Sequence, residues 1–315
     1  MLDTGYVMDV LYLIEATHWR KTTMIERCRT PLSIAAQRGH ETLVKLLLVL
    51  DNIDVNTKTR NGHTPLLFAT FGGHSTIVNI LLAMGKVDVN FKNDDSLTPL
   101  LVATFKGHQD IVKLLLSTDK VDVDSKNVNG WTPFAVAIAR GYDTTAKLLH
   151  STGKIDINSK NDKGQTPLSL AALRGHETVV GLLLATGKVD INSKNDKGQS
   201  PLSLAAESGQ DTVVELLLAT GKVDVNFGDD NNQTPLLLAI SGWHEVVVKR
   251  LLETGKIDID SKNSESQTLL MLAVQRGYDT LVTLLLATSK VDVNSKDDKG
   301  QSPLSLAAEI LDLGA

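Results

Sequence analysis

A threonine or serine, in most cases followed by proline, recurs along this chain every 34 residues, as from Thr30 to Thr64. A fixed period of this length is typical of repeat proteins, in which each unit buries its apolar face only against its neighbours. The 315 residues therefore predict one stack of like units, not two ordinary globular domains. The recurring positions are Thr30, Thr64, Thr98, Thr132, Thr166, Ser200, Thr234, Thr268 and Ser302.

Each unit divides into the same parts, which residues 166–199 illustrate. Thr166 is a preferred helix N-cap, and the proline after it suits the first helical position, where no N–H donor is needed. The sequence PLSLAALR predicts a short helix ending at Gly175, and HETVVGLLLAT predicts a second helix from its apolar spacing. The remaining TGKVDINSKNDKGQ has no helical period and predicts a loop or β-hairpin finger.

The sixth position of every unit is alanine, and this predicts how the units stack. A small side chain lets the first helices of neighbouring units approach closely, whereas a larger one would overpack the contact at a cost of about 1–3 kcal/mol. The nine alanines are Ala35, Ala69, Ala103, Ala137, Ala171, Ala205, Ala239, Ala273 and Ala307.

The unit consensus TPLxxAAxxGHxxVVxLLLxxGKxDVN, followed by a finger that ends near Gly, resembles the ankyrin repeat. The resemblance implies an all-α repeat solenoid of helix-turn-helix units with β-hairpin or loop fingers. The unit here has 34 residues where the usual one has 33, and it lacks His after Pro-Leu. This long form looks like ankyrin arrays of many fungal proteins, some of which resemble the sensor arms of NACHT-type NTPases. We expect a degenerate N-terminal capping repeat at 1–29, eight repeats at 30–301 and a partial repeat at 302–315.

Composition excludes several classes of protein. The single Cys28 excludes a disulfide framework and a cysteine zinc site. The net charge of -5 gives no drive toward nucleic acid, and no apolar run approaches the roughly 18 residues that span a membrane. We expect a cytoplasmic monomer without cofactor or metal, whose partner is another protein.

Motifs that suggest chemistry are all incomplete. The GK pairs lack the hydroxyl residue that a P-loop needs, since Lys188 precedes Val189. An EF-hand starting at Asp190 would place Pro201 where a bidentate Glu is required. The HE pairs lack the second His of a zinc protease. We therefore expect no enzyme. The repeated His, as at His176, is expected to bond a neighbouring turn, and the repeated Asp to shape a turn.

Functional information should lie where the units differ. The resemblance implies binding through the finger tips and the groove-facing side of the first helices. At those positions Phe71, Phe105 and Trp131 concentrate scarce aromatic residues in three adjacent units, which favours a protein-binding surface. The remaining candidates for this surface are the apolar Leu67, Leu97, Leu101 and Val128, with His63 and Arg29 beside them and the basic row Arg38, Lys106 and Arg140.

Three alternatives stay open. The aromatic residues could instead pack between repeats, and the basic row could be a solvated face. The same groove could bind a small molecule or catalyse a reaction with His63, Asp94 and Asp95 as acid–base groups. The array could also be a spacer or sensor arm of a larger protein. Separately, Trp243 replaces the glycine between two helices, which indicates a local loop change or a second contact.

Overall fold

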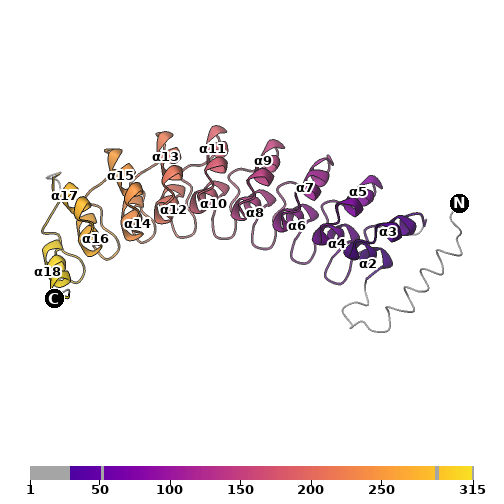
Figure 1. The fold of residues 1–315 in the computed structure, drawn as a ribbon, viewed down its shortest axis with the longest axis horizontal. Coiled ribbons are helices and arrows are strands. Elements are labelled where there is room, and N and C mark those ends of the chain that lie inside the picture. Colours follow the sequence, from indigo (N-terminus) through magenta and orange to yellow (C-terminus); the bar gives the residue numbers. More distant parts are fainter. Residues whose placement is uncertain (1–28, 51–52, 288–290, 314–315) are drawn as a thin grey trace. The chain divides into compact units, whose positions relative to one another are not determined.

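A computed structural model describes residues 29–50, 53–287 and 291–313, drawn as a ribbon in Figure 1. Side chains are described as far as Glu309. The chain forms two compact units, the first ending at Ile155 and the second beginning at Asp156. Each is described by itself. The expected division at residues 29 and 302 stays a prediction, and residues 1–28 of the expected cap lie outside the described residues.

The first unit is a stack of helix pairs. The first helices of the pairs pack on one another in order, α2 on α4, α4 on α6 and α6 on α8, and the second helices form a parallel layer of their own. The helices are α2 (Pro31–Arg38), α3 (Glu41–Leu48), α4 (Pro65–Gly72), α5 (Ser75–Ala83), α6 (Pro99–Lys106), α7 (Gln109–Leu116), α8 (Pro133–Ala139) and α9 (Asp143–Ser151).

The second unit repeats this arrangement. Its first helices, α10, α12, α14, α16 and α18, pack consecutively, and α11, α13 and α15 pack in the second layer. The helices are α10 (Pro167–Arg174), α11 (Glu177–Ala185), α12 (Pro201–Glu207), α13 (Asp211–Ala219), α14 (Pro235–Ser241), α15 (Glu245–Glu253), α16 (Leu269–Gln275), α17 (Asp279–Ala287) and α18 (Pro303–Leu313).

The helix ends follow the predicted capping chemistry. Thr64 Oγ1 accepts a hydrogen bond from the Leu67 N–H at 3.2 Å, and Pro65 follows it at the first helical position. Gly107 ends α6 with a φ of 74°, and a Cβ there would lie 3.1 Å from the Tyr142 ring of the next repeat. Glycine is thus required both for the turn and for the close approach. The helical prediction and the all-α solenoid are confirmed.

The alanine row lies in the contact between first helices, as expected. Ala69, Ala103 and Ala171 are among eight members that are completely buried. Ala307 on α18 is half-buried. The other buried residues are chiefly Leu, Val and Ile from both helices of each repeat, so the core runs along each stack.

The described fingers are loops, which is one of the two forms that the sequence predicts. The one β-type pairing there is an isolated bridge between Lys262 and Thr268. From Asn93 onward each described finger is instead closed by an Asn or Asp side chain, whereas Thr59 Oγ1 closes the finger before it by accepting from the His63 N–H at 3.1 Å. Asn195 Oδ1, for example, accepts from the N–H groups of Lys197 and Gln199 at 2.9 Å. An Asx turn supplies the acceptors that a strand ladder would otherwise supply.

A second asparagine ties five of the loops to the next repeat, whereas Asp124 and Asp260 hold the same position in two others. Asn192 Nδ2 donates to the Lys222 carbonyl at 3.1 Å, and Asn192 Oδ1 accepts from the Asp224 N–H at 3.1 Å. The amide therefore bonds the neighbouring backbone twice, as one strand of a sheet bonds another. The same pair of bonds is made by Asn56, Asn90, Asn158 and Asn226.

We predict that Asn192→Asp lowers the free energy of unfolding by about 1 kcal/mol, because a carboxylate cannot donate to the Lys222 carbonyl. Asn192→Ala removes both bonds and should cost more. Urea denaturation followed by circular dichroism measures the two losses, with Lys222→Gln as the control because it alters the same loop but not its backbone. Unfolding of Asn192→Ala that matches the unchanged protein would contradict the tie.

Candidate functional site

The two kinds of position expected to bind a partner face each other in the structure. The last residue of each finger lies beside the residue eight positions later, on the first helix. Arg29 Nη1 donates to Gln37 Oε1 at 2.9 Å, and the rings of His63 and Phe71 are 5.6 Å apart, edge to face. The same pairing recurs in several repeats. In the second unit it joins Gln199 to Glu207 and Gln301 to Glu309, each at 2.8 Å.

The cluster at the first two described fingers contains one residue that sequence reasoning missed. Phe68 is 6% exposed and lies under both Arg29 and His63. The Arg29 guanidinium is 5.3 Å from the Phe68 ring centroid, and the His63 ring is 5.2 Å from it. Comparable repeats hold Leu170 at this position. The replacement of Leu by Phe at this repeat position is the sequence feature that could have identified Phe68.

His63 is held as a neutral imidazole by its surroundings. Asn93 Nδ2 donates to His63 Nε2 at 3.1 Å. The Asn93 amide cannot turn over, because its Oδ1 already accepts from the N–H groups of Asp95 and Leu97 at 3.1 and 2.8 Å. Burial lowers the pKa of His63, Asp95 opposes that shift, Arg29 reinforces it, and Asp94 opposes it.

Phe105 and its neighbours form the exposed part of the candidate surface. The Phe105 side chain is 48% exposed, and the Arg140 guanidinium lies 4.0 Å from its ring centroid, within cation–π distance. Val128 is 57% exposed at the next finger tip. Trp131 and Leu97 are half-buried, as is Phe71. Asn127 Oδ1 accepts from the Trp131 N–H at 3.0 Å, which fixes the backbone that carries the indole.

Leu67 and Leu101 are wrong as members of a binding surface. Their side chains are 0% and 1% exposed, inside the helix stack. Four of the nine repeats hold serine at this position, and it is equally buried at Ser33, Ser169 and Ser203. Its hydroxyl is satisfied internally, since Ser169 Oγ donates to the Thr166 carbonyl at 2.8 Å. A serine at this position therefore indicates a hydrogen bond in the first turn of the helix and not contact with solvent.

The basic row is exposed where it was predicted. Arg38 and Lys106 are exposed and are the last residues of α2 and α6, where positive charge complements the helix dipole. Arg140 caps α8 and stacks on Phe105 as described above. Of the three, Arg140 is the one in contact with a residue of the variable positions.

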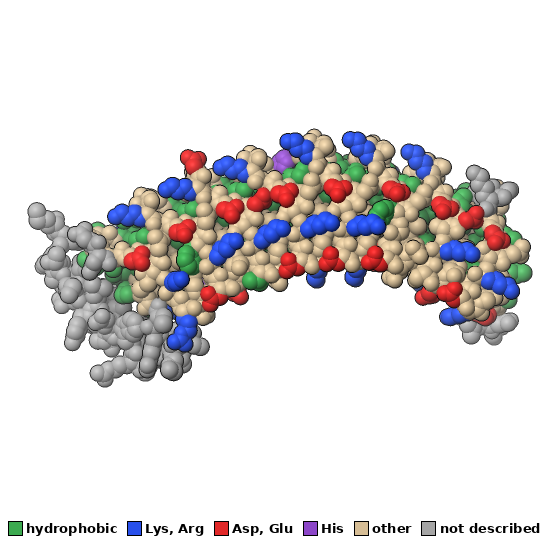
Figure 2. All heavy atoms as spheres, turned by 180° about the vertical axis from the view of Figure 1, so that it is seen from behind, with side chains coloured by type: hydrophobic (Ala, Val, Ile, Leu, Met, Phe, Trp, Pro, Cys, Tyr) green, Lys and Arg blue, Asp and Glu red, His purple; other side chains and the backbone are tan. Residues whose placement is uncertain are grey.

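The repeated His and Asp have the structural roles that were expected. His74 Nε2 is 3.0 Å from the Gln37 carbonyl of the preceding repeat, and His244 Nε2 is 3.0 Å from the Glu207 carbonyl. The repeated aspartates accept from the N–H two residues on, as Asp88 does from Asn90 at 3.0 Å. Figure 2 shows the resulting rows of Lys and Arg alternating with rows of Asp and Glu. Among the residues that the structure describes, no group of three acidic, His or Cys side chains could hold a metal ion.

Trp243 does not change the turn between its helices. It takes the place of the glycine with a φ of 63°, and the His244 N–H still bonds the Ala239 carbonyl at 3.0 Å, as His176 bonds Ala171. The prediction of a local loop change is therefore wrong. The indole is 57% exposed, and its ring lies 5.1 Å from that of Tyr278.

The same face of the second unit is polar. A hollow of about 490 Å³ lies there, beside Gln199 and Glu207. Four carboxylates and one lysine line it, so it differs in charge from the basic and aromatic face of the first unit. These charged residues are Asp196, Lys197, Glu207, Asp229 and Asp230.

The comparison with protein families decides what kind of scaffold carries these surfaces. A family model described as ankyrin repeats in three copies matches residues 5–93, 82–161, 145–229, 221–297 and 244–311. The chain belongs to the ankyrin-repeat family. Ankyrin repeats are generally protein–protein interaction modules, and the proteins built from them are typically non-enzymatic scaffolds. A search of curated proteins finds no match to the chain.

No helix in the described part of this ankyrin-repeat chain combines the length and the apolar character needed to cross a bilayer.

We predict that His63 makes stability depend on pH. Its pKa in the folded chain lies below the ordinary 6.5, so the unfolded chain binds more protons as the pH falls through that value. The free energy of unfolding should therefore fall on acidification, and His63→Gln, the residue at the equivalent Gln165, should remove that part of the fall. Urea denaturation at about pH 8 and about pH 5 measures the free energy of unfolding of both proteins. The other histidines are present in both, so their contributions cancel when the two proteins are compared. An equal difference between the two proteins at both pH values would contradict the assignment.

Proposed function

We propose that the first unit binds a protein segment through the aromatic surface, defined as Phe71, Leu97, Phe105, Val128 and Trp131. The single observation that carries the proposal is the exposed Phe105 ring under the Arg140 guanidinium. A large apolar side chain at 48% exposure, with apolar neighbours on the adjoining fingers, is the type of surface that partners cover. Aromatic and Arg residues also dominate the energetics of protein interfaces.

The charges around the aromatic surface indicate the chemistry of the partner. Arg29, Arg38, Lys106 and Arg140 contribute four cations beside the apolar residues. A segment that combines acidic side chains with apolar ones would complement both features, and complementary charge speeds association and excludes wrong partners. The Arg140 guanidinium already lies on the Phe105 ring in the free chain. Less side-chain entropy is therefore lost when a partner binds.

His63 supports this surface and is not proposed as an acid–base group. Its Nε2 accepts from the Asn93 amide, and its ring packs against Phe68 and Phe71, so it fixes the position of the Phe71 ring. A small molecule acted on by His63 with Asp94 and Asp95 is therefore the weaker alternative. We further expect the chain to act as a cytoplasmic monomer, alone or as the recognition arm of a larger protein.

We predict that Phe105→Gln weakens binding of a selected peptide by about fivefold to tenfold, because an anchor ring loses about 1 kcal/mol or more of contact. The peptides are selected from a display library of random segments against the unchanged chain, and should be rich in acidic and apolar residues. Binding is measured by fluorescence anisotropy.

Gln275→Ala is the matched control, because Gln275 holds the same repeat position in the second unit. It should leave the affinity unchanged, and circular dichroism should show both variants folded. Peptides that bind a folded Phe71→Gln, Phe105→Gln, Trp131→Gln triple variant as tightly as the unchanged chain would contradict the aromatic surface.

A further inference from the structure

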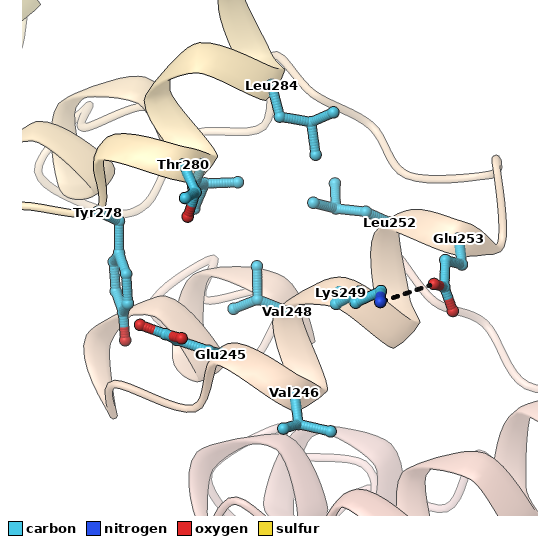
Figure 3. A pocket seen from close by; sticks show the side chains of 10 residues that line it. Glu245, Val246, Val248, Lys249, Leu252, Glu253, Tyr278, Thr280 and Leu284 are labelled. Carbon is cyan, nitrogen blue, oxygen red and sulfur yellow. Dashed lines mark ion pairs between the residues drawn. The ribbon is translucent and has the colours of Figure 1, made fainter.

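A second candidate site lies in the other unit, on the layer of second helices. A groove of about 630 Å³ opens between α15 and α17 (Figure 3). This volume is within the range of small-molecule sites, about 300–1,000 Å³. Val246 and Leu284 are 54% and 49% exposed beside it. Its apolar walls are Val246, Val248, Leu252, Leu281 and Leu284.

Tyr278 brings an unsatisfied polar group to this groove. Its side chain lines the groove and is only 5% exposed. Its buried hydroxyl has no hydrogen-bond partner among the described residues. A buried hydroxyl without a partner costs about 1–3 kcal/mol, so a bound group that meets it would be favoured. Burial raises the pKa of Tyr278, the negative charge of Glu245 raises it further, and the positive charge of Arg276 opposes the shift.

The charged groups at the groove are not balanced. Lys249 pairs with Glu253 at 4.0 Å, which leaves Glu245 without an ion-pair partner among the described side chains. Figure 3 shows the Glu245 carboxylate beside the hydroxyl end of Tyr278, at one side of the apolar walls. An acceptor carboxylate, an aromatic ring and an apolar wall together are complementary to a cation with an apolar body.

Trp243 contacts the ring of Tyr278 from outside the residues that line the groove. Its φ of 63° is a region that a bulky residue adopts only under constraint, and its indole is 57% exposed against the Tyr278 ring. Strained residues of this kind cluster at ligand sites. The indole also offers the best side-chain face for a cation.

We propose that the groove between α15 and α17 binds a small molecule that carries a protonated amine on an apolar body. The ammonium group donates to the Glu245 carboxylate and to the Tyr278 hydroxyl oxygen, and the body packs against Val248, Leu252 and Leu284. This site lies in a different unit from the aromatic surface, so either proposal stands or falls without the other.

The test uses 2-(1-naphthyl)ethylamine as the probe and 1-naphthaleneacetic acid as its counterpart with opposite charge. Isothermal titration calorimetry on the full chain should show the amine binding at least about tenfold more tightly than the acid. Glu245→Gln should weaken amine binding by about tenfold or more, since it removes a charge-assisted contact, and Tyr278→Phe should weaken it about threefold.

Glu177→Gln is the matched control, because Glu177 holds the position of Glu245 in an earlier repeat of the same unit. It should leave amine binding unchanged, and circular dichroism should show all variants folded. Equal affinity for the amine and the acid would show apolar binding only and would overturn the proposal. So would no amine binding at millimolar concentration, or equal losses in Glu245→Gln and Glu177→Gln.

Discussion

The contact between consecutive first helices is the interaction on which the rest of the structure depends. A single helix pair has no partner of its own for its apolar faces, so the neighbouring pair must cover them. The end of the stack shows this directly. Leu270 on α16 is 3% exposed, whereas Leu304, at the same repeat position on α18, is 78% exposed. Among the described helices, α18 packs closely on α16, and no described helix covers its other side.

This dependence separates structural positions from variable ones. The alanine at the sixth position cannot vary, because a larger side chain would force the first helices apart. The Asn192 side chain bonds the backbone of the next loop twice, and this repeat position holds only Asn or Asp from Asn56 to Asp260. The last finger residue and its partner eight positions later differ between repeats while the stack is kept. They hold His63 and Phe71 in one repeat and Gln199 and Glu207 in another.

The sequence was sufficient for whatever repeats, and less reliable for what varies. Helix positions, caps, the buried alanines and the turn role of aspartate all follow from local chemistry that nine units display in register. Leu67 and Leu101 were misjudged because a buried serine bonds its own N-cap carbonyl, which no spacing reveals. Phe68 was overlooked because one apolar residue replaced another. The groove between α15 and α17 depends on how far apart two helices lie, and single-sequence patterns contain no such distance.

Trp243 shows how a departure from the repeat can be tolerated energetically. The left-handed backbone conformation costs a residue other than glycine about 1–3 kcal/mol. The hydrogen bond from the His244 N–H to the Ala239 carbonyl is kept, so the substitution of Trp for Gly does not remove it. An aromatic pair contributes about 0.5–1.5 kcal/mol beyond its burial, so the contact with Tyr278 offsets a substantial part of the strain. At the equivalent Gly107 the next repeat also presents a tyrosine, Tyr142, yet glycine is kept. A tyrosine neighbour alone therefore does not favour Trp, and the partner ring of Trp243 also lines the groove between α15 and α17.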